Sequence, residues 1–116
     1  MKKYLIITSI ILAFQSCVGA QKNSELFTIY LVRHSEKDLT TNNHSNPPLT
    51  QCGEQRSENL SDFLKDVNLD VVYSTDYSRT QKTALPTALS KGLEITGYNP
   101  QELEKFSKLL LHYLDR

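Results

Sequence analysis

Two arginines and a histidine are the residues of this chain best suited to chemistry. Arg33 and His34 stand together at the end of an apolar run, and Arg79 follows a second such run. A guanidinium offers planar, paired donors to phosphate oxygens and stays charged at any working pH. A neutral imidazole can attack with one ring nitrogen while a hydrogen bond holds the other. Together the three groups suit a phosphoryl group, with His34 as the nucleophile.

An Arg-His pair alone is weak support for this chemistry, because such pairs are common at solvated strand ends. The elements around the pair strengthen it. Residues 26–32 form a near-continuous apolar, β-rich run, typical of a strand covered on both faces. Residues 70–74 predict a second strand just before Arg79. Ligands gather at the carboxyl ends of parallel strands, so we expect His34 and Arg79 at one edge of the sheet.

The rest of the chain alternates helices with strands. Thr50 is the expected N-cap of the first helix, and Asn99 that of the last, with Pro100 and Glu102 in its first turn. The order β-α-β-α-β-α predicts an α/β fold with three layers, α/β/α, and a mostly parallel sheet. The remaining predicted elements are a loop over 35–48, helices over 51–66, 80–89 and 100–116, and a strand over 93–96. The predicted inward residues are Leu60, Phe63, Leu64 and Val67 in the first helix, and Leu103, Phe106, Leu110 and Tyr113 or Leu114 in the last.

The N-terminus reads as an export signal. Two lysines precede an apolar stretch of about ten residues, which is shorter than the roughly 20 needed to span a bilayer. Two cleavage sites remain open: Cys17 as the lipidated first residue of a lipoprotein, or release after Ala20. We therefore predict a signal peptide over 1–20, a tether over 21–25 and one domain over 26–116. The predicted location is the bacterial periplasm or cell envelope, with membrane attachment through lipidated Cys17 in the first case.

Composition excludes several classes of protein. The chain has 116 residues, 39% of them hydrophobic, with 13 Lys and Arg against 13 Asp and Glu. This length allows one domain, and the neutral balance argues against a nucleic-acid partner. Cys52 has no partner for an internal disulfide if Cys17 is lipidated or removed. No cluster has the spacing of metal ligands, so we expect no metal and no cofactor.

Three blocks of the sequence together resemble the histidine phosphatase superfamily. They read YLVRHSEK at residues 30–37, PLTQCG at 48–53 and VYSTDYSRTQKTA at 72–84. Their order and spacing are similar to those of the phosphoglycerate mutase-like group, and they resemble the short SixA-like bacterial phosphatases in particular. The resemblance covers about residues 26–100. It implies a phosphoglycerate mutase-like α/β fold and a reaction through phosphohistidine.

The resemblance assigns roles by position. His34 matches the family nucleophile, Arg33 the phosphate-binding residue before it, and Arg79 the second phosphate-binding arginine. Ser35 stands where the family usually has glycine, and its hydroxymethyl group would crowd the phosphate or hydrogen-bond to it. A turn into the first helix also matches and implies a packing role for its members, Leu49, Thr50 and Gly53.

Two parts of the family site have no match. The family uses a second histidine on a late strand, and the chain reaches Arg116 before such a strand, so we expect a truncated domain. His44 and His112 are expected on the surface. The proton donor is unassigned, with four candidates: Glu36, Asp76, Glu94 and Glu102.

The sequence thus predicts an exported phosphatase that hydrolyses phosphomonoesters through His34, with a phosphorylated small molecule or phosphate as its partner. The alternative is an impaired or non-catalytic phosphate-binding fragment of a longer histidine phosphatase. Because donors are needed on several sides of the transferred group, we expect little activity from these 116 residues alone.

Overall fold

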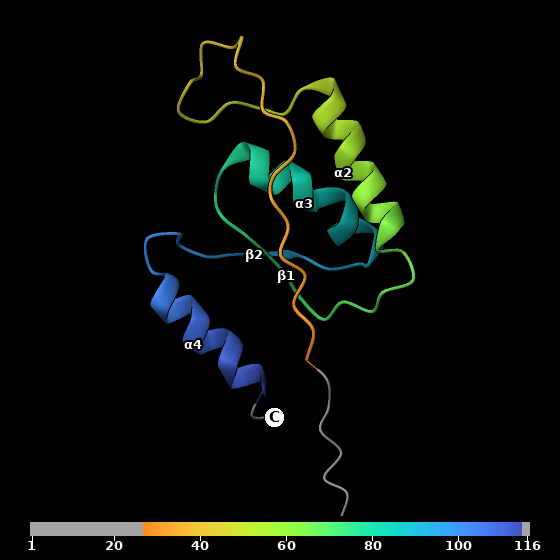
Figure 1. Ribbon diagram of the computed structural model, residues 1–116, viewed down its shortest axis with the longest axis vertical. Helices are drawn as coiled ribbons and strands as arrows, with labels where there is room; N and C mark the ends of the chain where they lie inside the picture. The colour runs from red at the N-terminus through yellow and green to blue at the C-terminus, as the bar shows by residue number, and fades with distance from the viewer. Residues whose placement is uncertain (1–26, 115–116) are drawn as a thin grey trace, which may run out of the picture.

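The computed structural model describes residues 27–114, and these form an α/β fold with a parallel strand pair. Figure 1 shows the strand pair between helices, two of them on one side and one on the other. This confirms the predicted α/β class. The elements in chain order are α2 (Gln51–Phe63), β1 (Val72–Ser74), α3 (Ser78–Ser90), β2 (Ile95–Gly97) and α4 (Leu103–Leu114). The predicted signal peptide, the lipidation candidate Cys17 and the tether over 21–25 lie outside the described residues.

The two strands run parallel and are joined by α3. Val72 lies opposite Ile95 and Ser74 opposite Gly97, so both strands end at the same edge of the sheet. The helix α3 packs on both strands, and α2 packs along α3. The first residue of α3 therefore follows closely after the carboxyl end of β1, where the sequence predicts the site.

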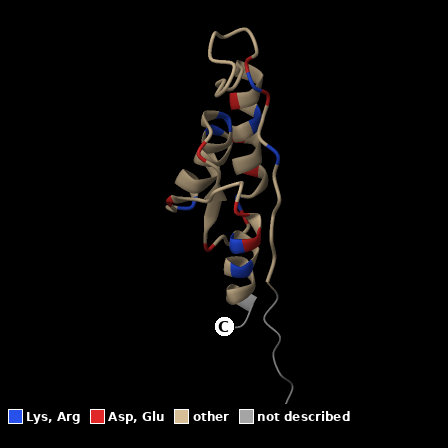
Figure 2. Ribbon diagram, turned by 90° about the vertical axis from the view of Figure 1, so that its left-hand side faces the viewer, with Lys and Arg blue, Asp and Glu red and all other residues tan. Residues whose placement is uncertain are grey.

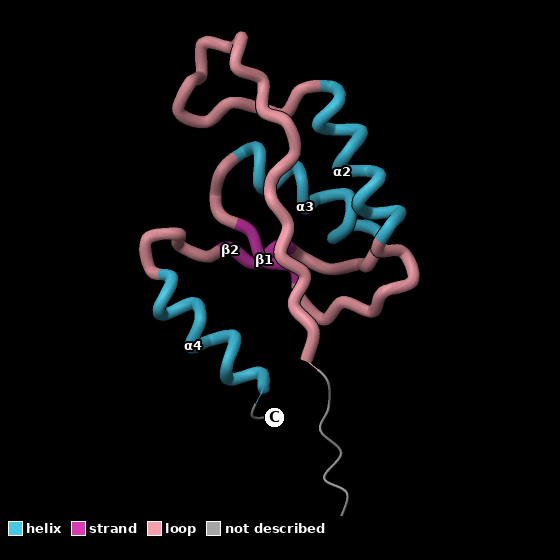
Figure 3. The backbone as a smooth tube through the Cα atoms, viewed as in Figure 1, coloured by secondary structure: helices cyan, strands magenta, loops and turns pink. Residues whose placement is uncertain are grey.

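Residues 27–32 are not a strand, which corrects the sequence prediction for 26–32. They are drawn as a loop in Figure 3, and no backbone hydrogen bond among the described residues joins them to β1 or β2. The prediction required cover on both faces, yet these residues are all exposed, and Leu31 is 92% exposed. Without cover or a ladder partner, the apolar run stays extended but unpaired.

The turn into α2 confirms the predicted packing residues. Thr50 is the N-cap, and its Oγ1 accepts a hydrogen bond from the backbone N–H of Gly53 at 3.0 Å. Leu49 is buried, and the Thr50 N–H donates to the Glu36 carbonyl at 2.8 Å. A Cβ on Gly53 would lie 2.5 Å from that same carbonyl oxygen, so only glycine fits here. The helix ends at Phe63 rather than at residue 66.

Small hydroxyl-bearing residues make up most of the buried residues in the described part of the chain. Leu49, Leu64 and Ala88 are the buried hydrophobic residues of the described chain. Buried serines and threonines outnumber them: Ser35, Ser57, Ser74, Thr75, Thr83 and Thr87. Three residues predicted to face inward are instead exposed: Phe63 at 79%, Leu103 at 58% and Tyr113 at 39%.

Aromatic rings hold α4 against the sheet. Phe106 stacks on Tyr98 with ring centroids 4.1 Å apart and meets the edge of Tyr73 at 5.1 Å. The ring of Tyr113 lies parallel to that of Phe27, with centroids 6.4 Å apart. The predicted Asn99 cap forms a turn instead: its side chain accepts from the Gln101 N–H at 3.0 Å, and the helix begins at Leu103.

Charges of both signs are interspersed on the helices. Figure 2 shows Lys, Arg, Asp and Glu mixed along α4 and on the helices above it. Exposed ion pairs accompany this mixing, such as Lys108 with Glu104 at 2.8 Å. No helix among residues 27–114 is both long and apolar enough to span a membrane.

Candidate active site

The His34 ring is fixed by its own neighbour. Its Nδ1 lies 2.8 Å from the carbonyl oxygen of Ser35, and the ring is half-buried. A carbonyl oxygen can only accept, so the proton of the neutral ring is on Nδ1. Nε2 then carries the free lone pair. A histidine in this state is arranged for attack by Nε2 on an electrophile.

Hydrogen bonds tie the residue after His34 to α3. The backbone N–H of Ser35 donates to Thr83 Oγ1 at 2.9 Å, and the Thr83 hydroxyl donates to the Arg79 carbonyl at 2.7 Å. Thr83 is one helical turn after Arg79, so both bonds lie in the first two turns of α3. The structure therefore brings His34 and Arg79 to the same end of α3, as the sequence predicts.

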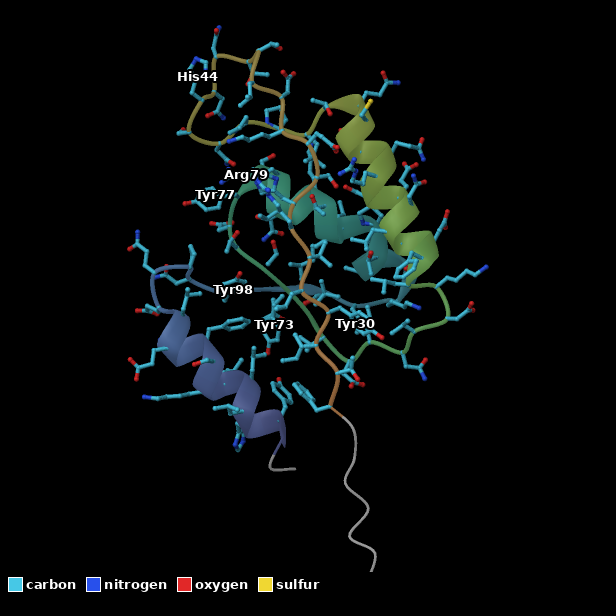
Figure 4. The ribbon with its side chains drawn as sticks, viewed as in Figure 1. Tyr30, His44, Tyr73, Tyr77, Arg79 and Tyr98 are labelled. Atoms are coloured by element: carbon cyan, nitrogen blue, oxygen red, sulfur yellow. The ribbon has the colours of Figure 1, made fainter. Side chains whose placement is uncertain are left out.

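Arg79 has a hydrogen-bonding group with no partner. Its guanidinium lies over the ring of Tyr77, with 4.3 Å from the guanidinium carbon to the ring centroid. Figure 4 shows both side chains at the N-terminal end of α3. The Nε–H is buried and makes no hydrogen bond within residues 27–114. Buried donors are nearly always satisfied in proteins, so this one indicates room for an oxygen ligand.

Arg33 differs from Arg79 in its surroundings. Its side chain is exposed, and it joins no ion pair or ring contact in the described part of the chain. The structure thus places Arg33 beside His34 along the backbone but does not bring its guanidinium into contact with Arg79. As a free cation next to His34, Arg33 can still approach an anion from solvent.

The candidate proton donors lie in different places. Glu36 is paired with Arg56, 2.6 Å from Oε1 to Nη2, while its Oε2 is buried and bonds to none of the described residues. Asp76 is exposed just after β1, at the edge where both strands end. Glu94 precedes β2 and so lies at the opposite edge, and Glu102 pairs with Lys105 at 3.5 Å. Of the four candidates, Glu36 lies two residues after His34 and Asp76 three residues before Arg79.

The loop before α2 is anchored to α3 by Asn46. Its Oδ1 accepts a hydrogen bond from the Ser78 N–H, the first of α3, at 2.8 Å. Tyr77, in the N-cap position, supplies no side-chain cap. Asn46 therefore caps α3 from a distant segment, and α3 starts two residues before the predicted start. The backbone bridge between Lys37 and Leu49 closes this loop at its base.

Residues outside this cluster behave as surface residues. His44 and His112 are exposed, as predicted, and Figure 4 shows His44 on the loop, away from Arg79. Cys52 is a free, exposed cysteine near the start of α2. No group of three or more His, Cys, Asp or Glu side chains suited to a metal occurs in the described part of the chain. An open depression beyond the strand ends is lined by Asp76, Tyr77, Gly97 and Tyr98, among others.

Sequence reasoning missed the partners that hold the His34 segment. Arg56 and Ser57 on α2, and Asn46 in the loop, each contact it or the start of α3. The only local signal was the spacing of Gly53 and Ser57, four residues apart on one helix face. That spacing marks a small-residue stripe, but it does not say which segment the stripe meets.

The structure is an α/β protein with His34 and Arg79 near the start of α3, and comparison with known proteins gives the family. A model of the histidine phosphatase superfamily (branch 1) matches residues 29–99. The chain belongs to this superfamily.

Individual relatives support the assignment. Over 75 residues, the chain is 31% identical to proteins named "Probable phosphoglycerate mutase GpmB" from Salmonella choleraesuis, Salmonella arizonae and Salmonella newport. The alignment includes 61% of this chain and 35% of each relative. The chain therefore spans about a third of the length of the curated relatives it matches.

Proposed function

We propose that this protein is a phosphatase that hydrolyses phosphomonoesters through a phosphohistidine on His34. The observation that carries the proposal is the His34 ring, whose Nδ1 is bonded to the Ser35 carbonyl at 2.8 Å, which leaves the Nε2 lone pair free. Membership of the histidine phosphatase superfamily supports it. The unpartnered Nε–H of Arg79, at the same end of α3, is a donor for the phosphoryl oxygens.

The reaction has two steps. Nε2 attacks phosphorus and forms the N–P bond while the ester P–O bond breaks, and the leaving alkoxide takes a proton from a nearby acid or from water. Water then attacks phosphorus, the N–P bond breaks, and phosphate and neutral His34 are released. Arg79 and Arg33 neutralise charge on the phosphoryl oxygens, and losing one such donor typically costs about a hundred- to a thousand-fold in rate.

The test is to trap the phosphorylated chain and locate the label. The chain is incubated with an aryl phosphate, quenched at alkaline pH to preserve the N–P bond, and mapped by mass spectrometry. We expect label on His34 and none in His34→Gln. His44→Gln and His112→Gln are matched controls, since both residues are exposed and away from the site, and they should label as the unchanged chain does. Label on another residue, or full turnover by His34→Gln, would refute the proposal.

One observation favours a second function, the binding of phosphate without turnover. Arg56 engages Glu36, one of the candidate acids for the leaving group, at 2.6 Å. Binding needs only donors such as Arg79. Titration with phosphate and vanadate separates the two functions: binding without hydrolysis supports this second one. Arg79→Lys should weaken binding, whereas Lys108→Met, which removes an exposed charge on α4, should not.

We also propose that the protein is exported, on the strength of the charged and apolar pattern over residues 1–20. Cell fractionation of Cys17→Ser against the unchanged protein distinguishes a lipoprotein from a soluble secreted form. A membrane-bound protein that becomes soluble on substitution supports lipidation at Cys17. Recovery of the full chain from the cytoplasm with Met1 intact contradicts export.

A further inference from the structure

A chain of hydroxyl groups crosses the molecule directly behind His34. Ser35, the residue that departs from the family's usual glycine, is 4% exposed, and its side chain turns away from the solvent side. Its Oγ lies 3.2 Å from Ser57 Oγ on α2. Its backbone N–H donates to Thr83 Oγ1 on α3 at 2.9 Å. Ser35 thus bridges two helices with one side-chain and one backbone contact.

The hydroxyl groups beside Ser35 also bond within their own helices. The Ser57 hydroxyl donates to the Gly53 carbonyl at 2.8 Å and, at the longer distance of 3.2 Å, to Ser35 Oγ. On the other side, Thr83 donates to the Arg79 carbonyl and accepts from the Ser35 N–H. Ser35 is therefore held by one residue of α2 and one of α3, each of which is itself bonded to its own helix.

We propose that Ser35, held by Ser57 and Thr83, is a positioning residue that keeps His34 in its Nδ1-protonated form. The carbonyl of Ser35 receives the His34 Nδ1–H at 2.8 Å. The same residue is fixed through its N–H by Thr83 and through its hydroxyl by Ser57. With both ends of the residue held, its carbonyl cannot turn away from the ring. The catalytic meaning of this arrangement rests on the proposed function, whereas the protonation form itself does not.

The burial of Ser35 and Ser57 explains why a serine fits where glycine is usual in the family. Ser57 is 1% exposed, one turn after Gly53, where α2 lies closest to the His34 segment. The space beside Ser35 is filled by the Ser57 hydroxyl, so the Ser35 side chain neither crowds a phosphate nor bonds to one. This answers the question that the sequence left open at this position.

The experiment reads the ring directly and needs no turnover. The ¹⁵N chemical shifts of the His34 ring, measured by NMR, report which nitrogen holds the proton. We expect the unchanged chain to show Nδ1–H. Ser57→Ala and Thr83→Val should each move the ratio of the two forms toward Nε2–H by about five- to tenfold, the effect of losing one hydrogen bond. Thr83→Ser, which keeps the hydroxyl, should restore the original ratio.

A matched control separates positioning from loss of packing. Ser61 lies one turn after Ser57 on α2 and also bridges the two helices, with its Oγ 3.2 Å from the Pro86 carbonyl and 3.1 Å from Ser90 Oγ. It has no link to His34. Ser61→Ala should leave the ring unchanged, and circular dichroism should show equal helix content in all variants.

The outcomes distinguish this inference from the proposed function. An unchanged ratio in folded Ser57→Ala and Thr83→Val, or an equal change in Ser61→Ala, overturns the positioning role. If the ratio moves as expected but no phosphate is trapped on His34, the positioning role stands and the phosphatase proposal fails. If phosphate is trapped on His34 while the ratio does not move, the phosphatase proposal stands and the positioning role fails.

Discussion

The helix α2 meets the His34 segment and α3 through glycine and serine, whereas α4 meets the sheet through aromatic rings. On the α2 side, a Cβ on Gly53 would lie 2.5 Å from the Glu36 carbonyl oxygen, Ser57 bonds Ser35 at 3.2 Å, and Ser61 bonds Ser90 of α3 at 3.1 Å. At the second, Phe106 lies 4.1 Å from Tyr98 and 5.1 Å from Tyr73, between ring centroids. Small residues bring backbones into contact, while rings hold backbones apart.

The difference follows the position of the candidate site. His34, Ser35 and Arg79 all lie on the side of the sheet with α2 and α3, where hydrogen bonds fix the orientation of these residues. Hydrogen bonds weaken steeply with a change in angle, so this side tolerates little movement. Ring contacts vary more gently with distance and orientation, so α4 can shift without a large loss of energy.

Gly53→Ala should give the largest effect, because it forces backbone apart on the close-packed side. The added Cβ meets the Glu36 carbonyl oxygen at 2.5 Å and displaces the His34 segment from α2. We expect a loss of about 2–3 kcal/mol in the free energy of unfolding, measured by urea denaturation. Gly97→Ala is the control, since nothing lies within 4 Å of a Cβ there. Equal losses in both variants would contradict the close packing.

Phe106→Ala should detach α4 while leaving the other side intact. It removes the stacked contact with Tyr98 and the edge contact with Tyr73, at about 0.5–1.5 kcal/mol each beyond area burial. We expect amides of α4 to exchange faster with solvent by hydrogen exchange, with those of α2 and α3 unchanged. Leu111→Ala, at a position 56% exposed, should change little. Faster exchange throughout the molecule would show that the two sides are not independent.

Thr87→Val should stabilise the protein by about 1 kcal/mol, because a buried hydroxyl without a partner costs desolvation energy. Thr87 Oγ1 is buried on α3 and makes no hydrogen bond with the described residues. Thr83, one turn earlier, is bonded on both sides, so Thr83→Val should destabilise. Thermal denaturation should show a higher melting temperature for Thr87→Val and a lower one for Thr83→Val. A change in the same direction in both variants would contradict the difference in hydrogen bonding between the two residues.

The smallest effect is confined to alkaline pH. Burial, followed by the Tyr113 hydroxyl at 3.3 Å, raises the pKa of Tyr73 to about 12 from an ordinary value of 10.0. Folding favours the protonated form of Tyr73, so this group contributes to the free energy of unfolding. The contribution is fully present below about pH 10 and is lost as the pH rises toward 12. Tyr73→Phe should therefore lose less stability than the unchanged chain over that range, as followed by denaturant titrations. Parallel losses would contradict the raised pKa.

Local sequence patterns predicted most elements but not their partners. The Thr50 cap, the order of strands and helices and the position of Arg79 all follow from residues within a few positions of one another. The strand over 26–32 was wrong because an apolar run forms a strand only when a partner and cover exist. The prediction that Leu103 and Phe63 face inward was wrong for the same reason, since periodicity identifies an apolar face but not what covers it.

The unpredicted parts of the site are contacts between distant segments. Ser57 bonds Ser35 across 22 positions, and Asn46 caps α3 across 32. Serine and asparagine are common in loops and helices, so neither residue type stands out before the chain is folded. These contacts depend on which faces meet, and that is decided by Gly53 and its neighbours rather than by the hydroxyl groups themselves.

The backbone bridge between Lys37 and Leu49 closes the intervening loop at its base, so the loop can change without a change at its two ends. Its two ends are joined by the Asp38 N–H donating to the Pro48 carbonyl at 2.8 Å, and Asn46 gives it one further anchor, on α3. Residues 39–45 can therefore change in length and composition while the base stays in register. Substitutions, insertions and deletions there need not displace the His34 segment, which is held by its own bonds to α2 and α3.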